Sequence, residues 1–279
     1  MKQLYVIGDP VDYSLSPMIH TAALKKLDLE HEYQYDKLRL KKTDLQQFVD
    51  RIRRDEIHGA SVTLPYKEII IEYVDQLTKE AELIQAANTL YHENGLAVAH
   101  NTDGIGCIRS FKEAGITLNN KQVILLGAGG AAKAIAFSLI RNNITKLHIF
   151  NRNQERAANL VRIIKKHLNC NVRTDTMDNL SYYMKDADIL INATSVGMKG
   201  ISEGTSLVNP SLLHSRLVVQ DIVYNPRKTA LISEAEKIGA TTVDGIDMLI
   251  HQGAEQFKIF TGKNAPVAVM KYALLEVLS

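Results

Sequence analysis

The sequence predicts an α/β protein that is divided into two domains. Its 279 residues exceed the roughly 100 to 150 residues of a common single domain. Short β-like runs alternate with helical patterns of about 10 to 15 residues, which is typical of βαβ units and a parallel sheet. A glycine-rich turn also joins one apolar run to the helical pattern that follows it.

Composition and charge exclude several classes of protein. With 46% apolar and 23% charged residues, the chain can bury sizeable cores and is not generally disordered. Its 33 basic and 31 acidic residues give a net charge of +2, without the strong positive field of a nucleic-acid binder. The longest apolar stretch, residues 123–140, contains Lys133, so no membrane span is expected. We expect a cytoplasmic protein with neither a nucleic-acid nor a membrane partner, as a monomer or a homodimer.

The first hundred residues contain signals for strands, a helix and a hairpin. The turn Glu93–Gly95, with its Asn-Gly pair, separates the β-like runs Thr89–His92 and Leu96–His100 and predicts a β-hairpin. Ser16 predicts a helix start as N-cap, because Pro17 suits the first helical position. Further strands are expected at Leu4–Ile7 and Ala60–Leu64.

A second pattern alternates strands with helices from residue 104 onward. Ile105, Ile108 and Phe111 recur at helical spacing, and this helix is expected to end at Gly115. After it we expect strands at Gln122–Leu126, Lys146–Phe150, Ile189–Ala193 and Val218–Val223, and helices at Ala131–Arg141 and Gln154–His167.

The C-terminal stretch Met248–Leu278 is mostly helical, with interruptions at Gly262 and Pro266. Such helices can return to pack on the first domain. The expected domains are therefore residues 104–240, and residues 1–103 together with 241–279.

The glycine-rich turn after residue 126 matches the pattern G-x-G-x-x-A. Gly127 permits the tight turn, Gly129 lets a pyrophosphate approach the backbone, and Ala132 allows close helix–strand packing. The N-terminal end of the helix can then bind the diphosphate. A glycine-rich loop without a ligand is the alternative, but the surrounding strand, helix and second strand favour a dinucleotide site. Its expected members are Gly127, Ala128, Gly129, Gly130 and Ala131.

Arginines, and no acidic residue, come directly after the second strand of this unit. Arg152 lies 25 positions after Gly127. NAD sites usually place Asp or Glu there for the ribose 2′-hydroxyl, whereas arginine accommodates the 2′-phosphate of NADP. Arg152 and Arg156 could instead only solvate the next helix, and Glu155 could repel a phosphate. The pattern favours NADP(H), because guanidinium groups bind phosphate oxygens bidentately.

Lys67 and Asp103 are the candidates for acid–base chemistry. Pro65 suits the first position of a helix, which would put Lys67 at the unfavourable end of the dipole for a cation. Such a lysine suits proton transfer, and an exposed lysine is the alternative. Asp103 is either a helix N-cap or a carboxylate partner of Lys67, depending on the fold. Ser14 and Ser16 likewise form either a helix start or a carboxylate site.

Metal and hydrolase chemistry are not expected. The nine histidines include no pair at i, i+4, and no H-E-x-x-H or G-x-S-x-G pattern occurs. Cys107 and Cys170 lie too far apart for a disulfide framework or a thiolate cluster.

Nine short segments occur over the whole chain in an order that resembles the shikimate dehydrogenase family. They are Ser14–Pro17, Val62–Lys67, Ala87–Thr89, Asn101–Gly104, Gly127–Ala132, Asn151-Arg152, Asn192–Met198, Asp221–Pro226 and Gly245–Gln252. The resemblance implies the NADP-linked reduction of 3-dehydroshikimate to shikimate, in aromatic amino acid biosynthesis. It also implies an open α/β substrate-binding domain beside a Rossmann-type parallel-sheet NADP-binding domain, with a cleft between them.

The resemblance implies a role for individual residues as well. Lys67 is expected to be the catalytic acid–base residue, with Asp103 as its partner. Substrate contacts are expected from Ser14, Ser16, Thr63, Lys67, Asn88, Asp103, Tyr224 and Gln252. Beyond the glycine turn, cofactor contacts are expected from Asn151, Arg152, Asn153, Arg156, Thr194, Ser195, Ile222 and Gly245.

Two residues depart from the family pattern. Ser61 stands where asparagine is usual, and a shorter hydroxyl can weaken a contact to the substrate or Lys67. Asp247 stands where glycine is usual, and it adds a charge or caps the following helix. These departures leave open a quinate/shikimate dehydrogenase with relaxed cofactor use, a paralogue with another cyclic substrate, and a regulatory protein without catalysis.

Overall fold

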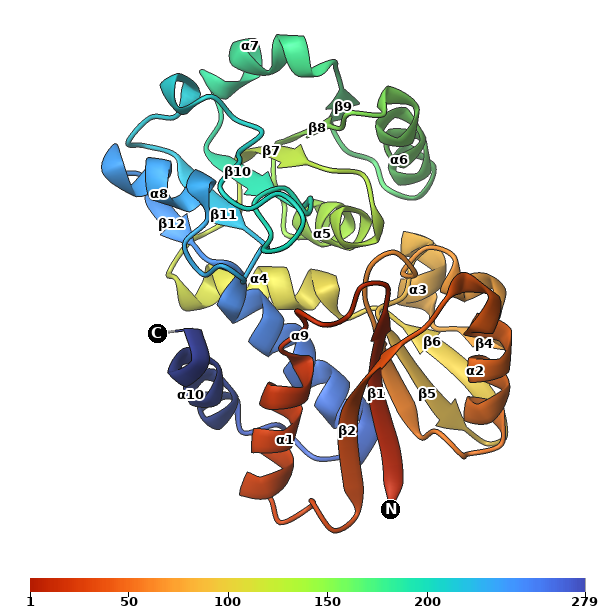
Figure 1. Cartoon of the computed structure of the whole chain (residues 1–279). Helices are drawn as coiled ribbons and strands as arrows, with labels where there is room; N and C mark the ends of the chain where they lie inside the picture. The colour runs from red at the N-terminus through yellow and green to blue at the C-terminus, as the bar shows by residue number, and fades with distance from the viewer. Residues whose placement is uncertain (279) are drawn as a thin grey trace. The chain divides into compact units, whose positions relative to one another are not determined.

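The computed structural model describes residues 1–278, which form two compact units (Figure 1). Unit 1 comprises Met1–Gly106 and the chain from Ile250 onward, and unit 2 comprises Cys107–Leu249. Both divisions fall inside helices, in α4 (Asp103–Glu113) and in α9 (Gly245–Thr261). The sequence pattern put the boundaries at 103/104 and 240/241, where helices begin or approach, because periodicity continues unbroken through a helix that two units share.

Unit 1 contains a six-stranded mixed sheet in the order β2-β1-β3-β5-β6-β4 (Figure 1). Its first three strands are parallel, and β5 runs antiparallel to both of its neighbours. The strands are β1 (Lys2–Gly8), β2 (Tyr33–Arg39), β3 (Gly59–Val62), β4 (Gln76–Leu77), β5 (Thr89–Glu93) and β6 (Leu96–His100). The hairpin β5–β6 confirms the Asn-Gly prediction, with Asn94 at φ +53° and Gly95 at φ +81°.

Helices cover both faces of this sheet. On one face, Ala60 and Val62 of β3 pack with the apolar side of α2 (Leu45–Arg53). On the other face lies α9, which approaches so closely that a Cβ on Gly59 would lie 2.6 Å from the Phe260 ring. This second face also carries α1 (Ser16–Lys26), which packs against α10 (Val267–Leu278). The short helix α3 (Lys79–Ile84) and the 3₁₀ turns η1 (Lys42–Asp44) and η2 (Ile70–Glu72) complete the unit.

Unit 2 contains a six-stranded parallel sheet in the order β12-β11-β10-β7-β8-β9 (Figure 1). The strands are β7 (Gln122–Leu126), β8 (Lys146–Phe150), β9 (Val172–Thr174), β10 (Ile189–Asn192), β11 (Val218–Asp221) and β12 (Thr241–Val243). The helices are α5 (Gly130–Arg141), α6 (Gln154–His167), α7 (Leu180–Met184) and α8 (Ala230–Lys237), with 3₁₀ turns η3 (Met177–Asn179) and η4 (Pro210–Leu212). Read from β9, the strands follow the doubly wound order 3-2-1-4-5-6, whose direction of winding reverses beside β7.

Two local predictions in unit 1 are wrong. Ser16 does not cap α1, because the helix already includes it and Leu15 precedes it as the cap residue. The Ser14 hydroxyl accepts a hydrogen bond from the Ser16 N–H instead, at 3.3 Å. No helix begins at Pro65 either: residues 64–69 form turns, and the Lys67 carbonyl accepts from the Ala87 N–H at 2.8 Å rather than continuing a helix. Among the helices of residues 1–278, none has the length and apolar character that crossing a bilayer requires.

Candidate active site

Sheet topology gathers the expected substrate residues of unit 1 at one edge. Strands β1 and β3 are parallel and end together, with Ile7 opposite Val62. Because β5 is antiparallel, its start lies opposite the end of β6, where Thr89 pairs with His100. The segments next to these strand ends therefore share an edge of the sheet. They carry Ser14, Ser16, Thr63, Lys67, Asn88 and Asp103.

Lys67 and Asp103 form an ion pair at this edge. The Lys67 Nζ donates a hydrogen bond to Asp103 Oδ2 at 2.5 Å. Asp103 is buried at the first position of α4, and the lysine side chain is 18% exposed. The lysine belongs to a turn, so the helix dipole expected from Pro65 does not act on it. The ammonium thus keeps N–H groups for a second acceptor while the carboxylate holds it in place.

Asn88 fixes the other side of the Asp103 carboxylate. Its Nδ2 donates to Asp103 Oδ1 at 2.9 Å and to Gln252 Oε1 at 3.1 Å. Its Oδ1 accepts from the Thr102 backbone N–H at 2.8 Å. Because a backbone N–H can only donate, this bond determines which end of the Asn88 amide faces Asp103. Lys67, Asn88, Asp103 and Gln252 therefore form one hydrogen-bonded cluster.

The remaining polar residues of unit 1 lie in separate local arrangements. Ser14 and Ser16 are both buried, and their hydroxyl oxygens are 3.3 Å apart. Thr63 directly follows β3, and its carbonyl accepts from the Tyr66 N–H at 3.0 Å. Ser61 faces α9 and donates to Gln256 Oε1 at 2.7 Å. The departure at Ser61 is therefore part of the helix–sheet packing, since its hydroxyl also accepts from Tyr35 at 2.6 Å.

The glycine turn of unit 2 has the geometry of a phosphate-binding turn. Gly127 lies at φ +117°, and a Cβ there would lie 2.9 Å from the Ala193 carbonyl oxygen. Gly129 is the N-cap of α5, and a Cβ there would meet nothing within 4 Å. A glycine at this position thus leaves the backbone N–H groups of the helix start open to a ligand. The helix begins at Gly130, one residue before its predicted start.

The cofactor-specifying segment follows β8, which pairs with β7. Phe150 lies opposite Leu126, so residues 151–153 share the carboxyl edge of the sheet with the glycine turn. Asn153 caps α6 by accepting from the Arg156 N–H at 3.1 Å, and Asn151 donates to the Asn153 carbonyl at 2.8 Å. Arg152 and Arg156 are exposed. Capping thus explains Asn153, whereas the two guanidinium groups are accessible to a phosphate.

A buried carboxylate organises the next two loops at the same edge. Asp221 ends β11, is fully buried and accepts from Asn192 at 2.9 Å, the Val223 N–H at 3.1 Å and Thr229 at 2.7 Å. Asn192 also accepts from the Thr194 hydroxyl at 2.7 Å. Burial raises the pKa of Asp221 to about 6, and the three hydrogen bonds oppose this rise. Asp221 therefore holds the loops that carry Thr194, Ser195, Ile222 and Tyr224.

The start of α9 lies against the same loops of unit 2. A Cβ on Gly245 would lie 2.6 Å from the Ile222 carbonyl oxygen, so only glycine fits there. Asp244 accepts from the Ile246 N–H at 3.1 Å at the start of α9 and pairs with Arg227. Asp247 lies in the first turn of α9, where a negative charge is favoured by the helix dipole.

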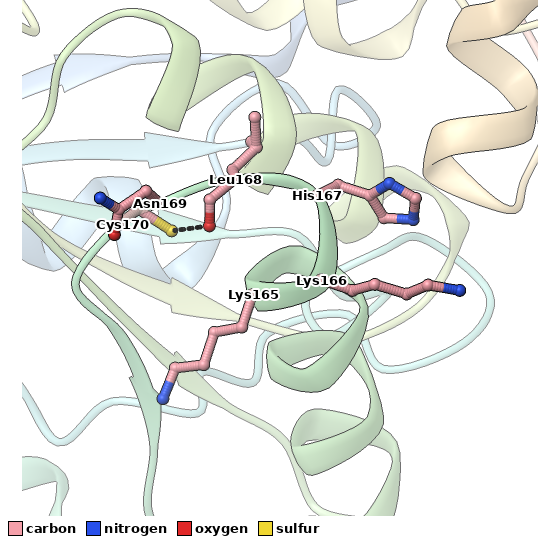
Figure 2. A pocket seen from close by; sticks show the side chains of 6 residues that line it. All are labelled: Lys165, Lys166, His167, Leu168, Asn169 and Cys170. Atoms are coloured by element: carbon pink, nitrogen blue, oxygen red, sulfur yellow. Dashed lines mark hydrogen bonds between the residues drawn. The ribbon is translucent and has the colours of Figure 1, made fainter.

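A surface pocket elsewhere in unit 2 has no catalytic features. Figure 2 shows it at the C-terminal end of α6, lined by Lys165, Lys166, His167, Leu168, Asn169 and Cys170. The Cys170 thiol donates to the Leu168 carbonyl at 3.7 Å, and burial raises its pKa, so it is a poor nucleophile. The lysines lie where cations stabilise the end of a helix.

Sequence reasoning missed four residues that organise these sites. Gln256, Asn192, Asp221 and Thr229 are all buried and hydrogen-bonded. Asn192 and Asp221 had one available signal, since each is a polar residue at the carboxyl end of a buried parallel strand. Gln256 had none, because a single glutamine inside a helical pattern is ordinary.

A doubly wound sheet with a phosphate-binding turn, together with a lysine–carboxylate pair, defines a dinucleotide-dependent oxidoreductase. Three family models match the chain: the shikimate dehydrogenase substrate binding domain at residues 6–90, the shikimate/quinate 5-dehydrogenase at 110–249, and the shikimate 5′-dehydrogenase C-terminal domain at 245–275. The chain belongs to the shikimate dehydrogenase family.

Individual relatives agree over nearly the full length. A shikimate dehydrogenase (NADP⁺) of Methanobrevibacter smithii is 42% identical over 278 residues, which cover 99% of this chain and 97% of that protein. A shikimate dehydrogenase crystallised with NADP⁺ is 38% identical, with a TM-score of 0.92 over 100% of this chain and 96% of the other. The enzyme of Thermus thermophilus, crystallised with NADP(H) and shikimate, is 31% identical, with a TM-score of 0.88 over 100% of both chains.

Proposed function

We propose that this chain catalyses the reversible, NADP-linked reduction of 3-dehydroshikimate to shikimate, a step of aromatic amino acid biosynthesis. The observation that carries this proposal is the Lys67–Asp103 ion pair, which Asn88 holds at the sheet edge of unit 1. Relatives named for this reaction, at up to 42% identity over nearly the whole chain, support it. In this proposal unit 1 binds the substrate and unit 2 binds the cofactor.

The residues present fit the implied cofactor. The open space at Gly129 and the helix start at Gly130 can take a diphosphate, and a side chain at Gly129 would fill that space. Arg152 and Arg156 would bind the 2′-phosphate, and the loops held by Asp221 would contact the nicotinamide half through Thr194, Ser195, Ile222 and Gly245. When bound, NADPH supplies the hydride that reduces the ketone.

Lys67 would supply the proton that the reaction needs. Negative charge develops on the ketone oxygen during reduction, and a donor must lie within about 3 Å of it. The ammonium of Lys67 is a positioned donor because Asp103 accepts one of its hydrogen bonds at 2.5 Å. In the reverse direction, the neutral amine would take the proton back from the alcohol while Asp103 keeps the lysine in place.

Polar side chains at the same edge would bind the rest of the substrate. The adjacent hydroxyls of Ser14 and Ser16 suit its carboxylate, and Thr63, Asn88 and Gln252 suit its hydroxyl groups. Tyr224 of unit 2 is a further proposed contact. A site that hydrogen-bonds hydroxyls rejects analogues that lack them, so the proposed substrate is a polyhydroxylated acid.

A cofactor–substrate matrix tests the function. Shikimate and quinate are each assayed with NADP⁺ and with NAD⁺ by nicotinamide absorbance. Activity confined largely to shikimate with NADP⁺ is expected. Comparable activity with quinate or NAD⁺ would point instead to a quinate/shikimate dehydrogenase with relaxed cofactor use. Folded protein that binds NADP⁺ but is silent in all four assays would be a regulatory protein or act on another substrate.

A further inference from the structure

Beneath the proposed site, one buried glutamine connects the α9 helix to Asn88. Gln256 is 1% exposed, and its Nε2 donates to the Asn88 backbone carbonyl at 2.8 Å and to Thr89 Oγ1 at 3.1 Å. Its Oε1 accepts from the Ser61 hydroxyl, which in turn accepts from the Tyr35 hydroxyl at 2.6 Å. Tyr35 is itself held by stacking on the His20 ring, with centroids 4.3 Å apart.

The direction of each hydrogen bond in this chain is determined. The Asn88 carbonyl can only accept, so Gln256 must turn its amide nitrogen toward it and its oxygen toward Ser61. Ser61 then donates to Gln256 and must accept from Tyr35. Thr89 accepts from Gln256 and donates to Asn88 Oδ1 at 2.7 Å. A network with one consistent set of directions holds its members in one arrangement.

Asn88 is the point where this network reaches the proposed acid–base pair. Gln256 holds its carbonyl directly, and Thr89 holds its side-chain oxygen. The Asn88 nitrogen consequently faces Asp103 Oδ1, whose carboxylate holds Lys67. We propose that Gln256 is a positioning residue for the reaction, which acts through Asn88 on the Asp103 carboxylate, with Ser61 and Tyr35 holding Gln256 in place.

This proposal rests on the proposed function and predicts a graded series of effects. Gln256→Leu removes all three hydrogen bonds of the amide, so kcat/KM for shikimate should fall on the order of 10- to 100-fold, as small misplacements of catalytic groups do. Ser61→Ala removes one partner of Gln256 and should cost less, and Tyr35→Phe less again. The Kd for NADP⁺ should stay unchanged in all three, because the cofactor residues belong to unit 2.

A control separates positioning from loss of stability. Ile19→Val removes the Cδ1 atom of a buried side chain that packs beside Gly253 of α9, and it leaves the polar network intact. Rates are expressed per NADP⁺-binding site, so that unfolded protein does not count. Ile19→Val should lower the unfolding temperature without lowering kcat. Gln256→Leu should lower kcat at any matched unfolding temperature.

A double-mutant cycle tests whether Gln256 acts through Asn88. In an Asn88→Ala background, Gln256→Leu should add little further loss, because its partner side chain is gone. Losses that multiply, or unchanged kinetics of Gln256→Leu in the wild-type background, would overturn the proposal. Should Gln256→Leu not fold, Ser61→Ala decides the matter by the same readouts. Wild-type protein that does not oxidise shikimate would refute the proposed function instead, so the two failures are distinguishable.

Discussion

Lys67 Nζ lies 2.5 Å from Asp103 Oδ2, although the two residues are 36 positions apart in the sequence. One follows the end of β3 and the other follows the end of β6. The antiparallel step from β3 to β5 and the Asn-Gly hairpin bring these two ends to the same edge. The ion pair is thus a consequence of topology, and its burial makes it stronger than a surface pair.

Replacing Lys67 by alanine should lower kcat by about 10²- to 10⁴-fold, because a positioned proton donor contributes that much. The Kd for NADP⁺, measured by fluorescence titration, should change little, since the proposed cofactor residues belong to unit 2. Lys79→Ala removes an exposed lysine from the same unit and is the matched control. A Lys67→Ala variant with wild-type turnover would remove this residue from the mechanism.

Replacing Arg152 by alanine should raise the KM for NADP⁺ by on the order of tenfold, as expected for a lost hydrogen bond to a charged group. The KM for NAD⁺, which lacks the 2′-phosphate, should stay nearly constant. Arg162→Ala, on the same helix α6 and also exposed, should leave both constants unchanged. Equal effects of Arg152→Ala on both cofactors would show that the guanidinium does not recognise the 2′-phosphate.

The sequence predicted elements whose signals are local. Asn94-Gly95 determines its hairpin, and the apolar strand before Gly127 and the helix after Gly129 place the turn between them. β2 was missed because Tyr33–Arg39 lies at the sheet edge and alternates apolar with polar residues. The helix expected at Pro65 failed because Lys67 uses its carbonyl to bind Ala87, a partner that no local pattern reveals.

Contacts between distant segments could not be predicted in the same way. Gln256 and Asn88 are 168 positions apart, and only the packing of α9 on β3 brings them together. Ser61 was expected to weaken a contact to the substrate or Lys67, and the structure instead gives its hydroxyl two partners, Tyr35 and Gln256. A residue type at one position says little until its three-dimensional neighbours are known.

Replacing His20 by phenylalanine should make the protein less sensitive to mild acid. Burial lowers the pKa of His20 from 6.5 to about 3, and the Gln256 side chain opposes this only weakly. Because the unfolded chain binds the proton more tightly, this residue favours folding above pH 6.5, and that contribution is lost as the pH falls toward 3. Urea unfolding between pH 7 and pH 4 should show a flatter dependence in His20→Phe than in the wild type.

The comparison requires a control for the general effect of losing an imidazole. His31→Phe removes an exposed histidine from the same unit. A wild-type pH dependence that His20→Phe reproduces unchanged would mean that the buried ring does not titrate during unfolding.

Replacing Asp221 by asparagine should have the opposite dependence on pH. The folded protein binds this proton more tightly than the unfolded chain does, because burial raises the pKa from 3.8 to about 6. The wild type therefore gains stability from protonated Asp221 below pH 3.8 and loses it as the pH rises through 6. The difference between these pKa values corresponds to roughly 3 kcal/mol of unfolding free energy.

The stability of Asp221→Asn relative to the wild type should consequently increase between pH 4 and pH 7. An asparagine side chain can still accept from Asn192 and the Val223 N–H, so the loops that carry Thr194 and Tyr224 should keep their places. Asp175→Asn serves as a control of opposite sign, because hydrogen bonds from Asn179, Thr176 and Tyr183 lower the pKa of that exposed carboxyl. Its relative stability should instead decrease as the pH rises. If Asp221→Asn followed the same direction as Asp175→Asn, Asp221 would have to be charged and favourably paired in the folded protein, contrary to its buried surroundings.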